Sequence, residues 1–278
     1  LGGQATLQLT EPLLEAYRKV PLIEPLAKQL KLKKAKMEEV LRAYASATEV
    51  QVAEVTTAAT FHTAALYQDF GKAMITSARP KKLNKAELEQ YNVMLEEQAF
   101  PFEEKAIELY ETNARRAAAG IFDPWVQKSY AELAKIKPVR YGKAERGDNN
   151  LPADVPRLEA ALVANPQQPA VLNQLGIVQR QQGQFEKARE AYEAAIALDP
   201  QASAPQMNLA ILFDLYLGDN TKALALYQRC LELSPADAPT LGKWVAELKT
   251  RKPVPNTAAP GVPAGTSATV AATRKDTP

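Results

Sequence analysis

The chain has 278 residues, of which 46% are apolar and 24% are charged, and its formal net charge is +2. A charge so close to neutral argues against nucleic acid as the main partner, and no uncharged apolar stretch reaches the roughly 18 residues that a membrane-spanning helix needs. One cysteine excludes an internal disulfide, and one histidine excludes a zinc site built from several His and Cys ligands. The composition favours helix, because Ala, Leu, Glu, Lys and Gln dominate and glycine is scarce.

The first half of the chain carries a helical pattern without a regular repeat. Apolar residues spaced by three and four predict helices over residues 26–45 and from about residue 48 to 78. Thr10, followed by Glu and Pro, is a predicted N-cap of the preceding short helix. The segment 84–87, Asn-Lys-Ala-Glu, is a capping box that opens another helix.

Two prolines and a glycine predict the next helix boundaries. The helix from the capping box should run to Phe100, and Pro101 should start a separate helix over residues 102–119. Gly120 should end that helix in the left-handed conformation. Asp123, followed by proline, should cap a further helix that runs to about residue 136.

A polar, turn-rich break over residues 143–150 predicts the joint between two domains. We therefore expect a helical N-terminal domain over residues 1–147 and a second domain over residues 148–252. After Pro253 the chain is rich in Pro, Ala, Thr and Gly, so residues 253–278 are predicted to be a disordered tail.

The second domain is organised by a repeat of 34 to 35 residues. Pro166, Pro200 and Pro235 mark the period, and leucine, glycine, alanine and tyrosine return at matching offsets before the last two prolines. The second copy has one extra residue, between Asp214 and Gly218. The pattern resembles the tetratricopeptide repeat (TPR), in which helix-turn-helix units stack into a superhelix.

This resemblance implies an all-α fold, in which an irregular helical N-terminal domain precedes a short TPR superhelix. Residues 168–200 and 202–235 form two full units, and residues 151–166 form the second helix of a degenerate first unit. An amphipathic helix around residues 241–248 should cap the open end of the stack.

The repeat positions predict how the helices pack. Gly176 should allow close approach of two helices, and Tyr192 and Tyr227 should fill the wedge between units. Cys230 replaces Ala195 of the previous copy, so we expect it to act as a small buried hydrophobe.

We expect partner binding on the exposed face of the first helix of each unit. The candidate partner-binding residues are Asn173, Ile177, Arg180, Asn208, Ile211 and Asp214. The Lys, Arg and Asn cluster with which co-chaperone versions of the fold clamp a C-terminal carboxylate is absent, so the groove should suit a helix or an extended peptide. Residues 209–217 are apolar almost all round, and they are either enclosed by the N-terminal domain or available to a partner.

One N-terminal helix is locally basic, and it has two interpretations. It is either a solvated surface or a site for an anionic membrane or an acidic partner. Its cations are Lys28, Lys31, Lys33, Lys34, Lys36 and Arg42.

An enzymatic alternative would combine His62 with Glu103 or Glu104 in a helical hydrolase. The sequence contains no nucleophile motif, glycine-rich phosphate loop or metal-binding cluster to support it. Adjacent carboxylates also diverge around a helix. We therefore expect no catalytic residues, cofactor or metal.

Five segments resemble a group of bacterial envelope proteins that join irregular helices to C-terminal TPRs. They are residues 97–108, 125–129, 138–141, 208–217 and 243–248. The group looks like the TPR accessories of TonB-type or adventurous-gliding-type machines. The resemblance implies a non-enzymatic scaffold of the Gram-negative envelope, periplasmic or associated with the outer membrane, with envelope proteins as partners and a signal peptide removed. The alternative is a cytoplasmic TPR adaptor or co-chaperone.

Overall fold

The computed structural model describes residues 7, 8, 10–49 and 52–251, and every regular element within them is helical. The predicted all-α fold is therefore confirmed for this part of the chain. The tail predicted over residues 253–278 lies outside the described residues.

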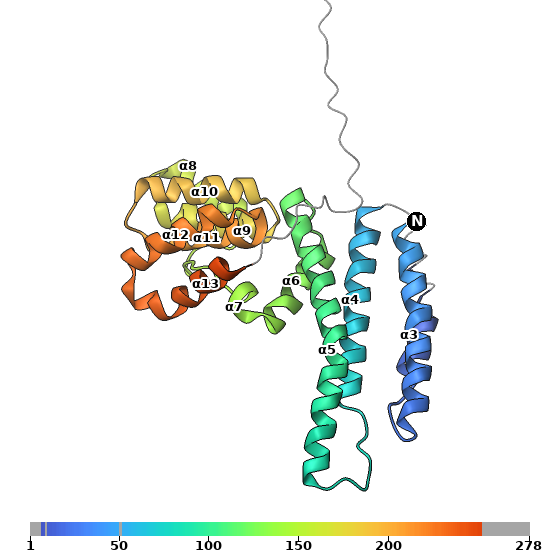
Figure 1. The fold of residues 1–278 in the computed structure, drawn as a ribbon. Helices are drawn as coiled ribbons and strands as arrows, with labels where there is room; N and C mark the ends of the chain where they lie inside the picture. Colours follow the sequence, from blue (N-terminus) through green and yellow to red (C-terminus); the bar gives the residue numbers. More distant parts are fainter. Residues whose placement is uncertain (1–6, 9, 50–51, 252–278) are drawn as a thin grey trace, which may run out of the picture.

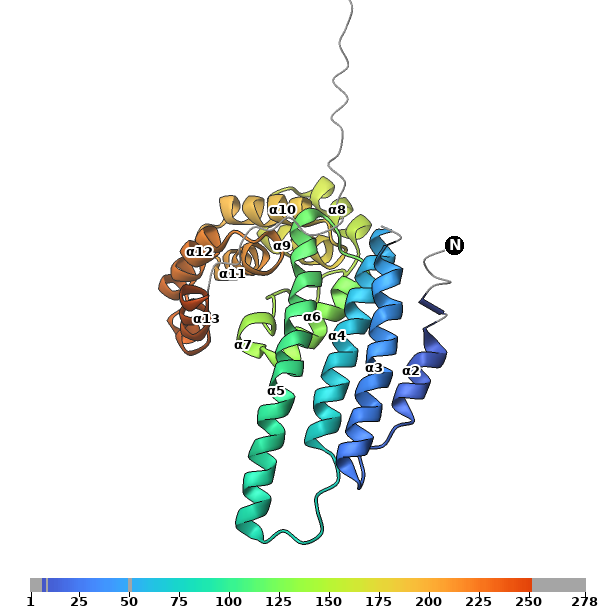
Figure 2. The same ribbon diagram turned by 45° about the vertical axis from the view of Figure 1, so that its right-hand side comes forward.

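The N-terminal helices lie side by side as an elongated bundle (Figures 1 and 2). Its helices are α2 (Glu11–Arg18), α3 (Leu26–Thr48), α4 (Ala53–Ile75) and α5 (Lys85–Arg115). Large side chains at helical spacing fill the space between them and are less than 4% exposed, for example Tyr17, Val40, Tyr44 and Phe70. The bundle therefore has the apolar core that the periodic pattern predicts.

Helix α5 contradicts the predicted boundary at Pro101, because it continues through this proline. Proline removes one helical hydrogen bond and crowds the carbonyl of residue 97, but both residues are exposed, so that carbonyl faces water. On the opposite side, Ala99 is fully buried and Phe102 packs against Phe70 with ring centroids 4.7 Å apart. Packing against α4 thus holds both halves in one helix.

The other predicted caps are confirmed, with one exception. The Asn84 side chain accepts from the main-chain N–H of Glu87 at 3.0 Å, and Gly120 has φ +80°. Asp123 Oδ1 accepts two main-chain N–H groups at 2.9 and 3.0 Å. Thr10 stands at the N-cap position of α2 without capping it, because its hydroxyl donates to the carbonyl of Leu7 at 2.6 Å.

Short elements connect the bundle to the repeats. They are the 3₁₀ turn η1 (Arg116–Ala119), helix α6 (Pro124–Ile136) and the single turn α7 (Pro138–Tyr141). The repeats then stack as α8 (Val155–Ala164), α9 (Pro169–Gln181), α10 (Phe185–Leu198), α11 (Ser203–Ile211), η2 (Leu212–Leu217), α12 (Asn220–Leu233), the turn η3 (Pro235–Asp237) and α13 (Ala238–Thr250). Helices α8 and α13 occupy the positions predicted for the half unit and the capping helix.

The extra residue of the second repeat is absorbed by a π-helical turn, η2, at the end of α11. A π turn holds one more residue than an α turn, so the helix can accept an insertion without losing its direction. The turn closes at Gly218, with φ +73°, and the N–H of Asp219 donates to the carbonyl of Phe213 at 2.9 Å.

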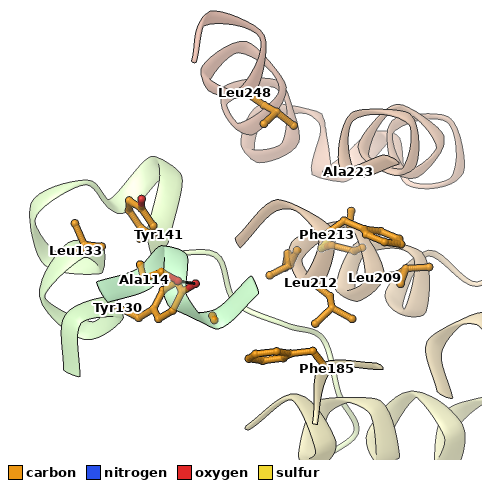
Figure 3. Packing of buried hydrophobic residues seen from close by; sticks show 14 of the residues in the cluster. Ala114, Tyr130, Leu133, Tyr141, Phe185, Leu209, Leu212, Phe213, Ala223 and Leu248 are labelled. Carbon is orange, nitrogen blue, oxygen red and sulfur yellow. Dashed lines mark hydrogen bonds between the residues drawn. The ribbon is translucent and has the colours of Figure 1, made fainter. Parts of the chain in front are cut away.

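One hydrophobic cluster joins the bundle to the repeats (Figure 3). The ring of Phe122 packs against those of Phe185 and Tyr216, with centroid distances of 5.0 and 5.9 Å, and the latter two rings stack on each other at 5.1 Å. The hydroxyl of Tyr130 lies 2.5 Å from the carbonyl oxygen of Leu215 in the π turn. Residues 209–217 are therefore enclosed by the protein itself, which is one of the two predicted outcomes. The division at residue 147 stays a prediction, and the shared core crosses it.

A substitution at Gly176 tests the predicted packing. A Cβ there would lie 2.6 Å from Cδ1 of Tyr192, which is fully buried. We expect Gly176→Ala to lower the free energy of unfolding by about 1–3 kcal/mol through overpacking. Gly242→Ala, in α13, is the matched control, because nothing lies within 4 Å of its Cβ position. Urea denaturation measures both, and equal stability of the two variants would contradict the packing.

Candidate functional site

The chain between α7 and α8 crosses the first helices of the repeats. We call residues 142–154 the linker, and we call the side chains of α9, α11 and η2 that face it the inner face. Residues 143–148 of the linker are in contact with the inner face. The candidate site therefore already holds an extended segment of the same chain.

Two asparagines hold the main chain of the linker. The N–H of Arg146 donates to Oδ1 of Asn208 at 2.8 Å. The carbonyl of Arg146 accepts from Nδ2 of Asn173 at 2.8 Å and from Nδ2 of Asn208 at 2.9 Å. Asn208 also donates to Oδ1 of Asn173 at 2.9 Å, so the two amides orient each other. Further along, the N–H of Asp148 donates to Oε1 of Gln174 at 3.3 Å. These contacts require an extended backbone and no particular side chain.

Glu145 supplies the acidic contact of the linker. Its Oε2 accepts from Nε of Arg180 at 3.0 Å, and its Oε1 accepts from the hydroxyl of Tyr192 at 2.7 Å. Burial, followed by the charge of Glu145, raises the pKa of Tyr192, so this tyrosine remains a hydrogen-bond donor. A tyrosine predicted only as a wedge between repeats thus also contacts the linker.

Lys143 makes the most buried contact of the linker. Its ammonium group pairs with Asp214, and both side chains are fully buried. Asp214 also accepts from the hydroxyl of Tyr227 at 3.1 Å and from Nη1 of Arg251 at 2.7 Å. Burial lowers the pKa of Lys143, and Asp214 acts in the opposite direction. A carboxylate between two cations and a phenol satisfies the hydrogen-bonding demand that burial imposes.

Arg146 adds a third, more exposed pair. Its guanidinium binds both carboxylate oxygens of Asp237, before α13, at 2.6 and 2.5 Å. The Arg146 side chain is 45% exposed, so water screens this pair. The hydrogen bond with Arg146 is the main reason that the pKa of Asp237 is lowered to about 2.

Glycine at position 147 lets the linker approach the repeats. A Cβ there would lie 2.9 Å from Cδ1 of Ile177, inside van der Waals contact. Beside this point a hollow of about 270 Å³ remains open, and its lining includes Arg146, Asp148, Asn173 and Ala204. The inner face therefore has unfilled space next to the linker.

The linker lies against five of the six predicted partner-binding residues, and the sixth, Ile211, is buried in the hydrophobic cluster. Asn173, Arg180, Asn208 and Asp214 hydrogen-bond to it directly. Ile177 lies under Gly147 and is 7% exposed, and Ile211 is 2% exposed. The expectation that both isoleucines are accessible is therefore wrong. Their role in binding a partner stays a prediction.

Sequence reasoning missed Lys143, Glu145 and Asp237 because it placed residues 143–150 in a solvated joint. The segment Lys-Ala-Glu-Arg carries the opposite charges to Asp214, Arg180 and Asp237. This complementarity is visible in the sequence, but only the fold shows which charges meet.

The residues of the enzymatic alternative lie apart. His62 packs against the rings of Trp125 and Tyr44, with centroids 4.7 and 5.7 Å away, and burial lowers its pKa. Glu103 lies beside Gly71 of α4. Gly71 follows His62 by nine residues in the same helix, so the two positions are about 14 Å apart along the helix axis.

The predicted packing role of Cys230 is confirmed, because its side chain is fully buried, and burial raises its pKa to about 11.

The described residues offer neither a metal-binding cluster nor a helix that could span a membrane. Among residues 7, 8, 10–49 and 52–251, no group of three or more His, Cys, Asp or Glu side chains could hold a metal ion. Within the same part of the chain, no helix combines the length and apolar character needed to cross a bilayer.

Comparison with known families identifies the repeats. Residues 169–202 and 206–237 each match the tetratricopeptide repeat family. This part of the chain is therefore a TPR domain, a class of helical repeat whose concave surfaces bind other proteins. The predicted TPR architecture is confirmed for these residues.

Two individual proteins show similarity. Over 95 residues the chain is 36% identical to protein O-mannosyl-transferase TMTC1 of Mus musculus, and this stretch covers 33% of the chain and 10% of that protein. The chain thus matches about a tenth of the relative's length. The solved structure of a protein titled "MamA RS-1 ArsTM double mutant" matches 75% of the chain and 90% of its own, at 17% identity and a TM-score of 0.29.

The two aspartates that bind linker cations should differ in their effect on stability. Asp214→Ala leaves Lys143 and Arg251 buried without their shared carboxylate, so the free energy of unfolding should fall by about 3–5 kcal/mol. Asp237→Ala breaks a pair whose Arg146 side chain is 45% exposed, and it should cost less than about 1 kcal/mol. Urea denaturation compares the two variants. Equal, small losses would mean that the buried pair does not hold the linker.

Proposed function

We propose that the protein is a non-enzymatic adaptor that holds an extended segment of another protein on the inner face of its repeats. In this proposal the linker occupies the site until the partner segment replaces it. The observation that carries the proposal is the set of three hydrogen bonds that Asn173 and Asn208 make with the main chain of Arg146. Side-chain amides that bind backbone groups accept an extended peptide of almost any sequence.

The charged pairs indicate the chemistry of the partner segment. Arg180 favours an acidic residue, and Asp214 and Asp237 favour basic residues on either side of it. Opposite charges at fixed positions set the register of a bound segment and exclude segments with the reverse pattern. We therefore expect the partner to present a basic–x–acidic–basic segment, with a small residue opposite Ile177.

A tethered linker is a strong competitor. A segment joined to its site by a short connection has an effective concentration in the millimolar range, so a free peptide binds poorly while the linker is in place. Weakening the linker should therefore expose the site. Glu145→Ala removes its acidic contact, and Gly147→Val forces it away from Ile177.

Peptide exchange tests this proposal. A fluorescent peptide with the sequence of residues 141–150 should bind the Glu145→Ala/Gly147→Val double variant saturably, as measured by fluorescence anisotropy. Its affinity for the unchanged protein should be at least about tenfold weaker, because the linker competes. Adding Arg180→Glu to the double variant should abolish binding, because this substitution opposes the peptide's own acidic residue.

Two controls distinguish exchange from general loosening. Asn149→Ala changes a linker residue outside these contacts, so this variant should bind the peptide as poorly as the unchanged protein. A peptide with Lys in place of its Glu should not bind the double variant. If circular dichroism shows that the double variant is folded and it still does not bind the peptide, the inner face serves only to hold the protein's own linker. The proposal that it binds a partner segment is then wrong.

We further propose that the adaptor works in the Gram-negative envelope, as an accessory of a transport or motility complex. The support is the resemblance of segments such as residues 97–108 and 208–217 to envelope TPR proteins. Fractionation of the native cells, followed by immunoblotting, should recover the protein in the periplasmic or outer-membrane fraction. Recovery with cytoplasmic proteins would favour the alternative, a cytoplasmic adaptor or co-chaperone.

A further inference from the structure

The positive charge of the chain is concentrated at one end of the bundle. Residues 19–34 and 72–85 contain ten Lys or Arg and a single Glu, a net charge of +9. The remainder contains 24 Lys or Arg and 31 Asp or Glu, a net charge of −7. The nearly neutral total therefore hides a strongly polarised molecule.

The two basic segments meet in space. The first includes the loop before α3 and the first turns of α3, and the second includes the end of α4 and the loop before α5. The main-chain N–H of Ala78 donates to the carbonyl of Leu22 at 3.0 Å and ties the loops together. We call this region the basic end, and it lies at the end of the bundle opposite the repeats (Figures 1 and 2).

Two of the ten cations maintain the loops. Lys33 is buried and donates to the carbonyls of Tyr17 and Val20 at 3.2 and 3.1 Å. Arg79 donates to the carbonyls of Ser77 and Ile75 at 2.5 and 2.6 Å. Their charges are used within the fold.

Eight exposed lysines remain at the basic end. Within the described part of the chain, only Lys19 has an acidic group within 4 Å, that of Glu15 at 3.6 Å. The eight are Lys19, Lys28, Lys31, Lys34, Lys72, Lys81, Lys82 and Lys85. Because seven of the eight lysines have no such acidic neighbour among the described residues, their charges repel one another in the free protein, and an anionic partner would relieve this repulsion.

Aliphatic side chains stand among these lysines. Ile23 is 51% exposed and Leu32 is 46% exposed. Ile23 directly follows Leu22, which is buried and tied to Ala78, so the fold holds this side chain outward. Lysines around projecting aliphatic residues match the interface of an anionic bilayer, where phosphates attract the cations and the headgroup region accepts apolar side chains.

We infer that the basic end docks the protein onto the surface of a membrane that contains anionic lipid. An acidic protein is the weaker match for two reasons. Recognition of a single carboxylate favours the two-pronged guanidinium of arginine, whereas all eight exposed cations are lysines, which act as point charges. Lysines spread over two loops and three helices also suit a plane of phosphates better than a narrow peptide. The opposite charge of the remainder would orient the basic end towards the lipid.

Vesicle sedimentation tests this inference with the 278-residue chain. It should bind vesicles of 70% phosphatidylcholine and 30% phosphatidylglycerol and should not bind pure phosphatidylcholine. The triple variant Lys28→Glu/Lys31→Glu/Lys82→Glu should bind the anionic vesicles at least about tenfold more weakly, since each lysine near the surface contributes roughly fivefold. Ile23→Ser/Leu32→Ser should weaken binding by a few fold, because the aliphatic contribution is lost.

A second triple variant separates local charge from total charge. Lys187→Glu/Lys243→Glu/Lys249→Glu changes three exposed lysines of the repeats and α13, and its binding should stay within about twofold of the unchanged protein. Equal loss in both triple variants would overturn the inference, as would undiminished binding by the first. If the protein binds soluble polyglutamate but neither vesicle, the basic end recognises an acidic polypeptide and membrane docking is wrong.

Discussion

The main chain of Arg146 is bound on both its N–H and its carbonyl by two asparagines, and the relation between the two halves of the molecule depends on this grip. Asn173 and Asn208 belong to successive repeats, so the main chain of one residue, Arg146, fixes the repeats against each other and against the chain that leaves α7. The charged pairs of Lys143 and Glu145 then set the register of the linker. The hydrophobic cluster around Tyr130 supplies the buried apolar contact between the bundle and the repeats, and the linker fixes how the two are aligned.

The sequence predicts the elements better than it predicts their meeting points. Repeat period, caps and the inserted residue are local properties, so the TPR units and the box at Asn84 could be predicted. The continuation of α5 through Pro101 could not be predicted, because it depends on which side of the helix faces water. Asn173 and Arg180 were predicted as surface residues of a groove, and in the structure both hydrogen-bond to the linker. That Lys143 pairs with Asp214 and Glu145 with Arg180 is a long-range pairing that no local pattern contains.

The two proposed surfaces differ in physical character. The inner face is a set of directional contacts with buried charges, and it suits one extended segment in one register. The basic end carries exposed lysines on flexible stems, such as Lys81 and Lys82, and its attraction acts over about a Debye length without demanding geometry. An adaptor with both could be concentrated on a surface by the second and select its partner by the first. The two functions can be separated by mutation because no residue belongs to both.

The position of the linker also changes how the repeats unfold. Arrays of TPR units ordinarily share contacts only with their neighbours, so their ends can open while the middle persists. Here the linker hydrogen-bonds to α9, to α11 and to Asp237 just before α13. Arg251, which follows α13, also donates a hydrogen bond to Asp214. Opening the stack at its α13 end would leave Arg146 and Asp214 without these partners. The linker therefore connects successive helices along the length of the stack, and the amides of these helices should lose protection from hydrogen exchange together rather than one helix after another.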